Sequence, residues 1–498
     1  MPPSFPVRPL RRLTMIITAA TAVGGLSGVA AVPAEAATDA GLVRKLNTVL
    51  SDGRAVRAKT GAVVLDAESG QQLYSRYGTR AVMPASNAKI VTAAAAMHTL
   101  GPNRRFATEV IRRADVVDGV LQGRLYLKGY GDPTTRQSDF AKLAAAVKAA
   151  GITKIDGSLV VDSSYFDHQR YNPGWKTSYA ADYYAAEVSA LTVAPNADLD
   201  SGTMIINYSP GRSGRPASIS TTPAAAKSYV KIVNRTTTSS RGTSTTFAAH
   251  RNHGSNTVTL TGRVPSGRST GHWQITVDKP ELYAGAVFRA ELAKLKITVG
   301  AKTVIQSTPG DLRHVVGRDT SVTLSELLVP FLKLSNNLHA ETLTKVMGRA
   351  AGRPGNWTDG LAVTTAYLKG LGVPMAGISL TDGSGVARAD RLTPLALATT
   401  LQKVQAEDWY PSFYNALPVA GDTRRMVGGT LRYRMNGTKA AKNAHAKTGS
   451  LTGVTALSGY VTGDDGRTYT FSLVSNYSGS TPRPVENSFV VALANWDG

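Results

Sequence analysis

The sequence predicts an α+β fold, because helical patterns and paired strand patterns both occur along the chain. Residues 62–75 and 454–475 each contain a strand, a turn with glycine and a second strand. Helical patterns occupy 86–97, 138–150 and, with one break, 325–349. The chain of 498 residues also exceeds the roughly 250–300 residues at which a single core stops growing. Two or three domains are therefore expected.

The first 36 residues follow the order of a secretory signal peptide. Three arginines precede an uncharged stretch that ends near Val32, and Ala34-Glu35-Ala36 supplies small residues for cleavage. A membrane anchor is the alternative, since the eighteen uncharged residues approach the spanning minimum of ~17–20. The stretch contains several Gly, Ser and Thr, however, and is weakly hydrophobic. We therefore expect an exported protein, cleaved after Ala36, without a permanent membrane span.

Composition excludes several kinds of chemistry and indicates an anionic partner. The absence of cysteine excludes disulfides, Cys-ligated zinc, iron–sulfur clusters and a cysteine nucleophile. The formal charge is +22, and the segment 201–277 contains nine basic residues and no acidic one. Strand-like runs in this segment predict an inserted β-rich module. Its charge would attract an anionic envelope polymer rather than nucleic acid, which an exported protein rarely meets; the alternative is that the charge only maintains solubility.

A Ser-x-x-Lys pattern at the start of a predicted helix is the first candidate catalytic motif. The spacing places Ser86 and Lys89 on one helix face. A serine hydroxyl becomes an effective nucleophile when a base removes its proton, and lysine can serve when burial lowers its pKa from ~10.4 toward neutrality. The pattern alone is weak evidence, because Ser228 and Lys231 repeat it in a strand-like run.

Two further motifs follow the first in a fixed order. Ser335-x-Asn337 lies between two helical patterns, and Lys447-Thr448-Gly449 leads into a Gly-rich strand that a ligand backbone could approach closely. A second Lys-Thr-Gly, at 59–61, precedes the Ser-x-x-Lys and is out of order. Ser-x-x-Lys, a Ser-x-Asn element and Lys-Thr-Gly together resemble the signature of penicillin-binding proteins and class A β-lactamases.

The sequence resembles, more specifically, the class C low-molecular-mass penicillin-binding proteins, which are serine D-alanyl-D-alanine carboxypeptidases and endopeptidases. The cue is the interval of 249 residues between Ser86 and Ser335, which is far shorter in β-lactamases. In this family two inserted domains fill the interval. Other segments that resemble the family are 127–133, 189–193 and Asp382-Gly383-Ser384-Gly385, which is followed by Arg388.

The resemblance implies a penicillin-binding/β-lactamase-like catalytic domain, in which helices flank an antiparallel sheet, interrupted by two inserted, β-rich domains. The expected divisions are a signal peptide at 1–36, the first part of the catalytic domain at 37–106, the first part of an inserted domain at 107–200, the basic β-rich module at 201–277, the second part of the inserted domain at 278–322 and the rest of the catalytic domain at 323–498.

The resemblance also implies a role for each motif residue. Ser86 would attack the D-Ala–D-Ala carbonyl, with Lys89 as the base for acylation and again for hydrolysis. Ser335 and Asn337 would pass a proton to the departing amine and hold the substrate backbone. Lys447 would supply positive potential at the site. No metal and no cofactor is expected.

Substrate contacts are expected mainly along the third motif. Thr448 and Ser450 would bind the terminal carboxylate, with Gly449 and Leu451 beside them. The backbone N–H groups of Ser86 and Ser450 would form the oxyanion hole, an arrangement worth ~2.7–4 kcal/mol per donor in other serine hydrolases. Tyr184 and Arg388 match the aromatic residue and the arginine of a side-chain pocket in the family; Tyr179 stands at its acid position, with Asp182 nearby.

Several ionisable residues outside the motifs are expected to be structural. None has partners at a spacing that indicates a metal site or a catalytic triad. They are His250, His253, His339, Glu341, His445 and the turn residues Asp464 and Asp465.

Two alternatives stay open beside a peptidase that cleaves peptidoglycan stem peptides and is acylated by β-lactam antibiotics. A β-lactamase would form the same acyl-enzyme and hydrolyse it quickly, but the class A Glu-x-x-x-Asn pattern is missing after the second motif and the chain is longer than that function requires. A catalytically inactive wall-binding protein would use the basic module. The three intact motifs argue against inactivity.

Overall fold

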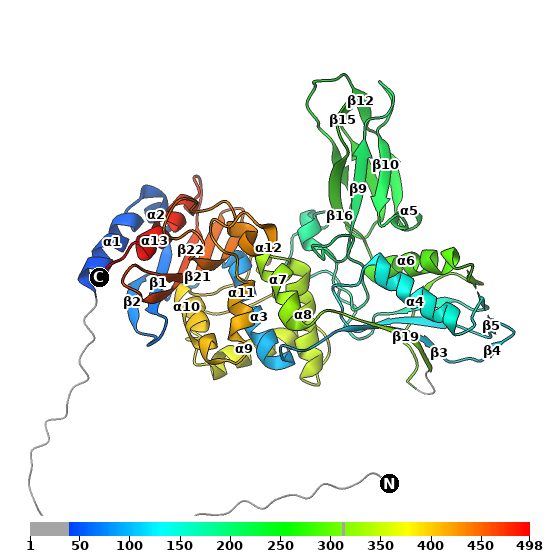
Figure 1. Ribbon diagram of the computed structural model, residues 1–498, viewed down its shortest axis with the longest axis horizontal. Helices are drawn as coiled ribbons and strands as arrows, with labels where there is room; N and C mark the ends of the chain where they lie inside the picture. The colour runs from blue at the N-terminus through cyan, green and yellow to red at the C-terminus, as the bar shows by residue number, and fades with distance from the viewer. Residues whose placement is uncertain (1–38, 311–313) are drawn as a thin grey trace, which may run out of the picture. The chain divides into compact units, whose positions relative to one another are not determined.

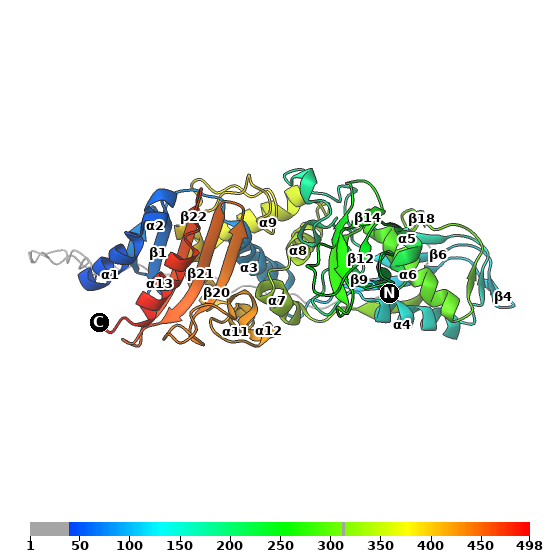
Figure 2. The ribbon, with the colours of Figure 1, turned by 90° about the horizontal axis from the view of Figure 1, so that it is seen from above.

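A five-stranded antiparallel sheet joins the two ends of the described chain (Figures 1 and 2). The computed structural model describes residues 39–310 and 314–498, and the predicted signal peptide lies outside them. The strand order is β2-β1-β22-β21-β20, with every neighbouring pair antiparallel. The strands are β1 (Gly61–Asp66), β2 (Gln72–Arg76), β20 (His445–Leu451), β21 (Val454–Thr462) and β22 (Thr468–Asn476).

Helices cover both faces of this sheet. Side chains alternate between the faces of a strand, so Leu457 of β21 packs with the helices of one face and its neighbour Ala456 with those of the other. The first face carries α1 (Ala40–Leu50), α2 (Gly53–Ala58) and α13 (Arg483–Ala494), which surround the sheet side chains with Leu46 and Phe489. The sheet is therefore the middle layer of three.

The other face is a larger helical layer. The core there contains the buried Ile90, Leu328, Phe331 and Leu343. Capping side chains fix the starts of two of its helices: Thr323 and Glu326 form a capping box before α7, and Asn336 caps α8. The helices are α3 (Ala88–Leu100), α7 (Leu324–Lys333), α8 (Asn337–Ala350), α9 (Trp357–Gly370), α10 (Pro394–Lys403), α11 (Tyr410–Ala416) and α12 (Arg425–Gly428), with a single turn η4 (Val404–Ala406). The turn η5 (Gly429–Leu431) follows α12 and places Leu431 in the core of the first face.

Between α3 and α7 the chain forms two more sheets packed against α4 (Gln137–Ala149) and α6 (Pro280–Lys294). One has the order β18-β8-β6-β3-β19 and the other β17-β7-β5-β4. Their strands are β3 (Ala107–Arg112), β4 (Val116–Val117), β5 (Val120–Leu121), β6 (Leu125–Gly129), β7 (Lys154–Ile155), β8 (Leu159–Asp162), β17 (Thr298–Val299), β18 (Val304–Ile305) and β19 (His314–Thr320).

The basic segment contains three small sheets. Their strand orders are β10-β9-β16, β11-β14-β13 and β12-β15. The elements are β9 (Thr203–Ser209), β10 (Ser218–Thr222), α5 (Ala226–Tyr229), β11 (Lys231–Asn234), β12 (Thr237–Ser239), β13 (Ala248–His250), β14 (Thr257–Thr261), β15 (Arg263–Pro265) and β16 (Gly271–Thr276). The expected strand at 229–233 begins only at Lys231, because α5 ends at Tyr229 and the chain turns there.

The predicted α+β class, with an antiparallel sheet flanked by helices, is confirmed. The expected strand pair at 454–475 is β21 and β22, and the helices expected at 138–150 and 325–349 are α4, α7 and α8. No helix within residues 39–310 and 314–498 is long and apolar enough to cross a membrane.

Candidate active site

Ser86 lies in a tight turn that leads into α3. This single 3₁₀ turn, η1 (Ala85–Asn87), precedes the α-helix, which begins at Ala88 and not at Ser86 as the sequence predicts. Ala85 has a φ of 46°, a left-handed conformation that is costly for any residue with a Cβ. Such strain persists only where the surroundings enforce it. The turn exposes part of the Ser86 side chain while the helix behind it is buried.

The Lys89 ammonium has three hydrogen-bond donors, and each has an acceptor. Its Nζ donates to Ser86 Oγ at 3.0 Å, to Asn337 Oδ1 at 2.6 Å and to the carbonyl of Ser384 at 2.7 Å. The side chain is fully buried, and burial lowers the pKa of Lys89 to about 7. Three carboxyl groups oppose that shift: Asp382, Glu341 and Asp390. The amine beside Ser86 can thus be neutral near pH 7.

The second and third motifs meet at Lys447. Ser335 stands between α7 and α8 with a φ of 61°, and Lys447 Nζ donates to its Oγ at 2.8 Å. Burial lowers the pKa of Lys447, and the nearby Lys89 lowers it further. Asn337 joins Lys89 to another segment, because its Nδ2 donates to the carbonyl of Tyr184 at 2.6 Å. The three motifs, far apart in sequence, therefore form one hydrogen-bonded cluster.

Strand β20 is an edge of the sheet and lies against η1. Asn87 Nδ2 donates to the Lys447 carbonyl at 3.2 Å. A Cβ at Gly449 would lie 2.8 Å from the Pro84 carbonyl, so glycine permits the close approach of the two segments. Thr448 and the exposed Ser450 are two residues apart and share one face of the strand. An edge strand can also pair with an extended peptide.

A cavity of about 460 Å³ lies at this edge. It contains residues of all three motifs together with three tyrosines from the segment around Tyr184. The lining residues are Ser86, Tyr179, Tyr183, Tyr184, Leu334, Ser335, Asn337, Val386, Thr430, Thr448, Ser450, Leu451 and Thr452.

The two residues expected in a side-chain pocket lie differently. Tyr184, in the turn η3 (Tyr183–Ala185), lines the cavity, and its hydroxyl donates to Asp182 at 2.8 Å. Asp182, three positions after Tyr179 at the family's acid site in the sequence, is thus beside this tyrosine. Arg388 is not among the lining residues, and its Nη1 donates to the Thr452 carbonyl at 3.1 Å, at the end of β20.

Four residues near the motifs were missed by the sequence analysis. Asp382 and Asp390 act on Lys89 through their charge, and the Ser384 carbonyl accepts from it. Thr430 accepts a hydrogen bond of 2.8 Å from Thr448 Oγ1. The Asp-Gly-Ser-Gly segment was a possible signal, but nothing in its local sequence relates it to a lysine almost 300 residues earlier.

Several of the ionisable residues that are expected to be structural have contacts within the fold. Burial lowers the pKa of His339 to about 4, and its Nε2 lies 2.9 Å from the Leu199 carbonyl. His445 stacks on Tyr414 with ring centroids 4.2 Å apart. Asp464 pairs with Lys439, and Asp465 with Arg467. Within the described ranges, no group of three or more His, Asp or Glu side chains could hold a metal ion.

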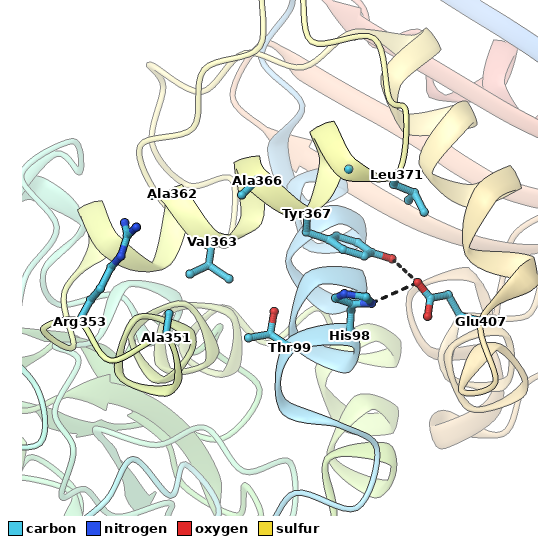
Figure 3. Close-up of a pocket in the computed structure, with 11 residues that line it drawn as sticks. His98, Thr99, Ala351, Arg353, Ala362, Val363, Ala366, Tyr367, Leu371 and Glu407 are labelled. Atoms are coloured by element: carbon cyan, nitrogen blue, oxygen red, sulfur yellow. Dashed lines mark hydrogen bonds and ion pairs between the residues drawn. The ribbon is translucent and has the colours of Figure 1, made fainter. Parts of the chain in front are cut away.

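A second cavity, of about 640 Å³, lies where the C-terminal part of α3 faces α9 (Figure 3). Tyr367 and His98 both contact the carboxylate of Glu407, while Val363 and Leu371 supply apolar wall. No residue of the three motifs lines it. Of these two cavities, the smaller one, at β20, is lined by residues of the three motifs.

Comparison with known proteins identifies the family. The sequence matches the D-Ala-D-Ala carboxypeptidase 3 (S13) family over residues 42–496. The chain belongs to this family. It is 38% identical over 462 residues to a D-alanyl-D-alanine carboxypeptidase of Actinomadura sp. (strain R39), a match that covers 91% of this chain and 84% of the relative. The carboxypeptidase DacB of Haemophilus influenzae is 24% identical over 428 residues, 84% of this chain and 86% of the relative.

Solved structures show the same fold. Penicillin binding protein 4 of Haemophilus influenzae superposes with a TM-score of 0.77, covering 90% of this chain and 98% of that protein at 23% identity. Its complex with a β-lactam superposes with a TM-score of 0.72. The family match confirms the predicted resemblance to class C penicillin-binding proteins and the predicted class of enzyme, a serine-type D-Ala-D-Ala carboxypeptidase.

Proposed function

We propose that the protein cleaves the D-Ala–D-Ala end of peptidoglycan stem peptides through an acyl-enzyme on Ser86. The observation that carries the proposal is the contact of 3.0 Å between Ser86 Oγ and the Nζ of the fully buried Lys89, whose pKa burial lowers to about 7. A base with this pKa is half neutral near pH 7 and can take the serine proton.

The proposed reaction has two stages. In the first, Lys89 takes the proton of Ser86, the serine oxygen bonds to the penultimate D-Ala carbonyl carbon, and the C–N bond breaks. The departing amine receives this proton through Ser335, which is hydrogen-bonded to Lys447, and Lys89 is neutral again. In the second, Lys89 takes a proton from water, the hydroxide that forms attacks the ester, and Lys89 returns the proton to the departing oxygen of Ser86. The backbone N–H groups of Ser86 and Ser450 are the proposed oxyanion donors.

Substrate binding is assigned to the edge of β20. The Lys447 amine and the hydroxyls of Thr448 and Ser450 are hydrogen-bond donors that suit a terminal carboxylate, with Gly449 and Leu451 as neighbours on the strand. Tyr184 lines the same cavity and Arg388 reaches the end of β20, which supports a role for both in binding the stem-peptide side chain. We extend the proposal to cross-linked peptides, in which the leaving amine belongs to a second stem peptide.

Labelling with a fluorescent penicillin tests the nucleophile. A β-lactam is bound by the structurally similar protein of Haemophilus influenzae, and we propose that it acylates Ser86 here. The purified protein should give a stable labelled band that Ser86→Ala abolishes. Ser228→Ala is the matched control, because Ser228 belongs to the second Ser-x-x-Lys and its hydroxyl only donates to the Ala225 carbonyl.

Other results would favour the alternatives. An unlabelled protein that leaves the penicillin intact would support the inactive wall-binding protein. An unlabelled protein that destroys the penicillin would support a β-lactamase. Release of D-alanine from a pentapeptide, lost in Ser86→Ala, would complete the case for the peptidase.

We also propose that the protein is exported and works at the cell wall, and that the domain divisions expected from the sequence hold. The first 36 residues supply the export signal. The sheets between α3 and α7 contain consecutive segments of the chain, while the five-stranded sheet combines its two ends, which supports an insertion. N-terminal sequencing of the secreted protein should start at Ala37; retention of the uncleaved chain in the membrane fraction would contradict this.

Binding to an anionic envelope polymer is proposed for the basic segment. Of its nine cationic residues, Arg251 is buried and donates to the Ala180 and Ser255 carbonyls, so it is structural. The other eight are exposed and available to a polyanion. They are Arg212, Arg215, Lys227, Lys231, Arg235, Arg241, Arg263 and Arg268.

A sedimentation assay with a phosphodiester wall polymer tests this. Binding should weaken at least tenfold between low salt and ~0.5 M salt, where the Debye length is only a few Å. Replacing Arg235, Arg241 and Arg263 with serine should weaken it further than replacing Lys148, Lys302 and Lys369, three exposed lysines elsewhere that change the net charge equally. Equal binding by both variants would contradict the assignment.

A further inference from the structure

A buried turn lies directly beneath Lys89. It runs from Asp382 to Ala387 and presents the Ser384 carbonyl to Lys89 Nζ at 2.7 Å. The Asp382 carboxylate holds the turn from within, accepting from the backbone N–H of Gly385 at 2.6 Å and of Ala387 at 2.7 Å. The direction of the Ser384 carbonyl therefore depends on how this turn is held.

Glu341 holds the same turn from α8. Its Oε2 accepts from the N–H of Gly383 at 3.1 Å, and its Oε1 from the N–H of Ser384 at 2.9 Å. The Trp357 indole N–H donates to Oε2 at 2.7 Å. The carboxylate is fully buried and has no contact with Ser86 or Lys89 through a hydrogen bond. Three donors of this kind stabilise the ionised form of the group.

We propose that Glu341 is a positioning residue for Lys89: through the backbone of Gly383 and Ser384 it fixes the carbonyl that receives the lysine, and its negative charge sets the pH at which Lys89 becomes a base. The inference rests on the proposed role of Lys89 in acylation. It also assigns a function to a residue whose sequence context indicated only a structural helix position.

The placement of Glu341 on α8 supports this role. It follows Asn337 by four residues, and Asn337 Oδ1 accepts directly from Lys89 at 2.6 Å. One turn of α8 thus acts on Lys89 by two routes: Asn337 contacts it directly, and Glu341 holds the Ser384 backbone that contacts it. The buried turn from Asp382 to Ala387 has little freedom to move, because a Cβ at Gly383 would lie 2.2 Å from Thr344 Oγ1.

The charge of Glu341 affects the pKa of Lys89 in a known direction. The ionisable groups that act on Lys89 are Asp382, Glu341, Asp390 and Lys447, and those around Glu341 include Asp382 and Lys345. Burial, and then Asp382, raise the pKa of Glu341 to about 7. Where Glu341 is ionised it raises the pKa of Lys89. Removal of its charge therefore lowers the pKa of Lys89, and the acidic limb of the acylation profile should move to lower pH.

Glu341→Gln in the full chain tests the proposal. The acylation rate with a fluorescent penicillin is measured from pH 5 to 9 and normalised to the amount of protein that can be labelled. We expect the acidic limb to move down by about half a pH unit or more, since a nearby charge shifts a pKa by up to 1–3 units. The limiting rate should fall about tenfold or more. The NH₂ group of the new side chain would face a backbone N–H without accepting from it, so the Ser384 carbonyl would be displaced.

A second variant serves if Glu341→Gln does not fold. Trp357→Phe keeps a ring in place and removes one donor to the Glu341 carboxylate. The carboxylate is then ionised less at each pH, so the limb should move in the same direction by a smaller amount. Since the two backbone contacts are unchanged, the limiting rate should stay within about threefold of the unsubstituted protein.

Glu291→Gln is the matched control. Glu291 is 5% exposed and contacts Gln137 and Lys294, and none of its hydrogen bonds reaches the three motifs. It should leave the pH profile unchanged. An unshifted limb in both test variants, or an equal shift in Glu291→Gln, would overturn the inference. If the unsubstituted protein itself is not labelled, the proposed function fails, which is a different result.

Discussion

Gly385→Ala should displace Ser86, the proposed nucleophile, without changing any polar group of the site. Gly385 has a φ of 84°, and a Cβ there would lie 1.9 Å from the carbonyl oxygen of Ala85, the residue before Ser86. Real Cβ contacts are essentially never shorter than 3.0 Å. A gap of about 1 Å must therefore open between the turn beneath Lys89 and the turn that carries Ser86.

The expected loss follows from this displacement. A misplacement of about 1 Å at a reacting centre costs on the order of 10²-fold in rate. Ala85 is already in a left-handed conformation and has few ways to adjust. The second-order rate of acylation by a fluorescent penicillin should fall about 100-fold. The positive φ adds roughly 1–2 kcal/mol of destabilisation, which lowers the melting temperature by a few degrees in a chain of this size.

Gly466→Ala separates the loss of acylation rate from the loss of stability. Gly466 has a φ of 79° in the turn between β21 and β22, and a Cβ there meets no atom within 4 Å. It should lower the melting temperature by a similar amount and acylate at the normal rate. Normal acylation by Gly385→Ala, or an equal loss of rate in Gly466→Ala, would refute the argument that the two turns must stay in contact.

Three further predictions concern the groups around the site. The rate of labelling by the penicillin, measured against pH, should increase through about pH 7. Burial lowers the pKa of Lys89 to that value, and only the neutral amine can accept the serine proton. A labelling rate independent of pH between 5 and 9 would contradict this. Asp390→Asn should lower the melting temperature less than Asp382→Asn, because only one oxygen of Asp390 accepts backbone N–H groups. Both oxygens of Asp382 accept them, so an amide there would leave one N–H unpaired at about 1–3 kcal/mol. Thr430→Val should raise KM for a pentapeptide several-fold with little change in kcat, because it removes the partner that orients Thr448 Oγ1; an unchanged KM would show that Thr448 needs no such partner.

The sequence was sufficient to predict the elements whose pattern is local. Strands β21 and β22 follow from the alternation of residues within each segment, and the start of α7 follows from its own capping residues. The strained start of α3 could not be predicted, because Ala85 is held by Gly385 and by β20, both far away in sequence. The pattern Ser228-x-x-Lys231 was set aside because a strand was predicted there, and that placement is wrong for Ser228, which lies in the short helix α5.

Charge was the least predictable property. The nine basic residues of the segment 201–277 look equivalent in the sequence, yet Arg251 is buried among backbone carbonyls. The three carboxyl groups near Lys89 come from α8 and from the segment between α9 and α10, and no spacing in the sequence relates them to Ser86. Burial is a property of the folded chain, so the ionisation of such groups becomes predictable only once their neighbours are known.

The basicity of Lys89 follows from two opposed effects that the fold keeps together. Burial alone favours a neutral amine, but a fully desolvated lysine would be too weak a base to take a serine proton efficiently. The carboxyl groups of Asp382 and Glu341 raise its proton affinity again from positions that hold the neighbouring backbone. Because the same side chains fix the Ser384 carbonyl, replacing either of them changes both the position and the strength of the proposed base. A substitution of Asp382 or Glu341 should therefore change the pH dependence and the limiting rate of acylation together.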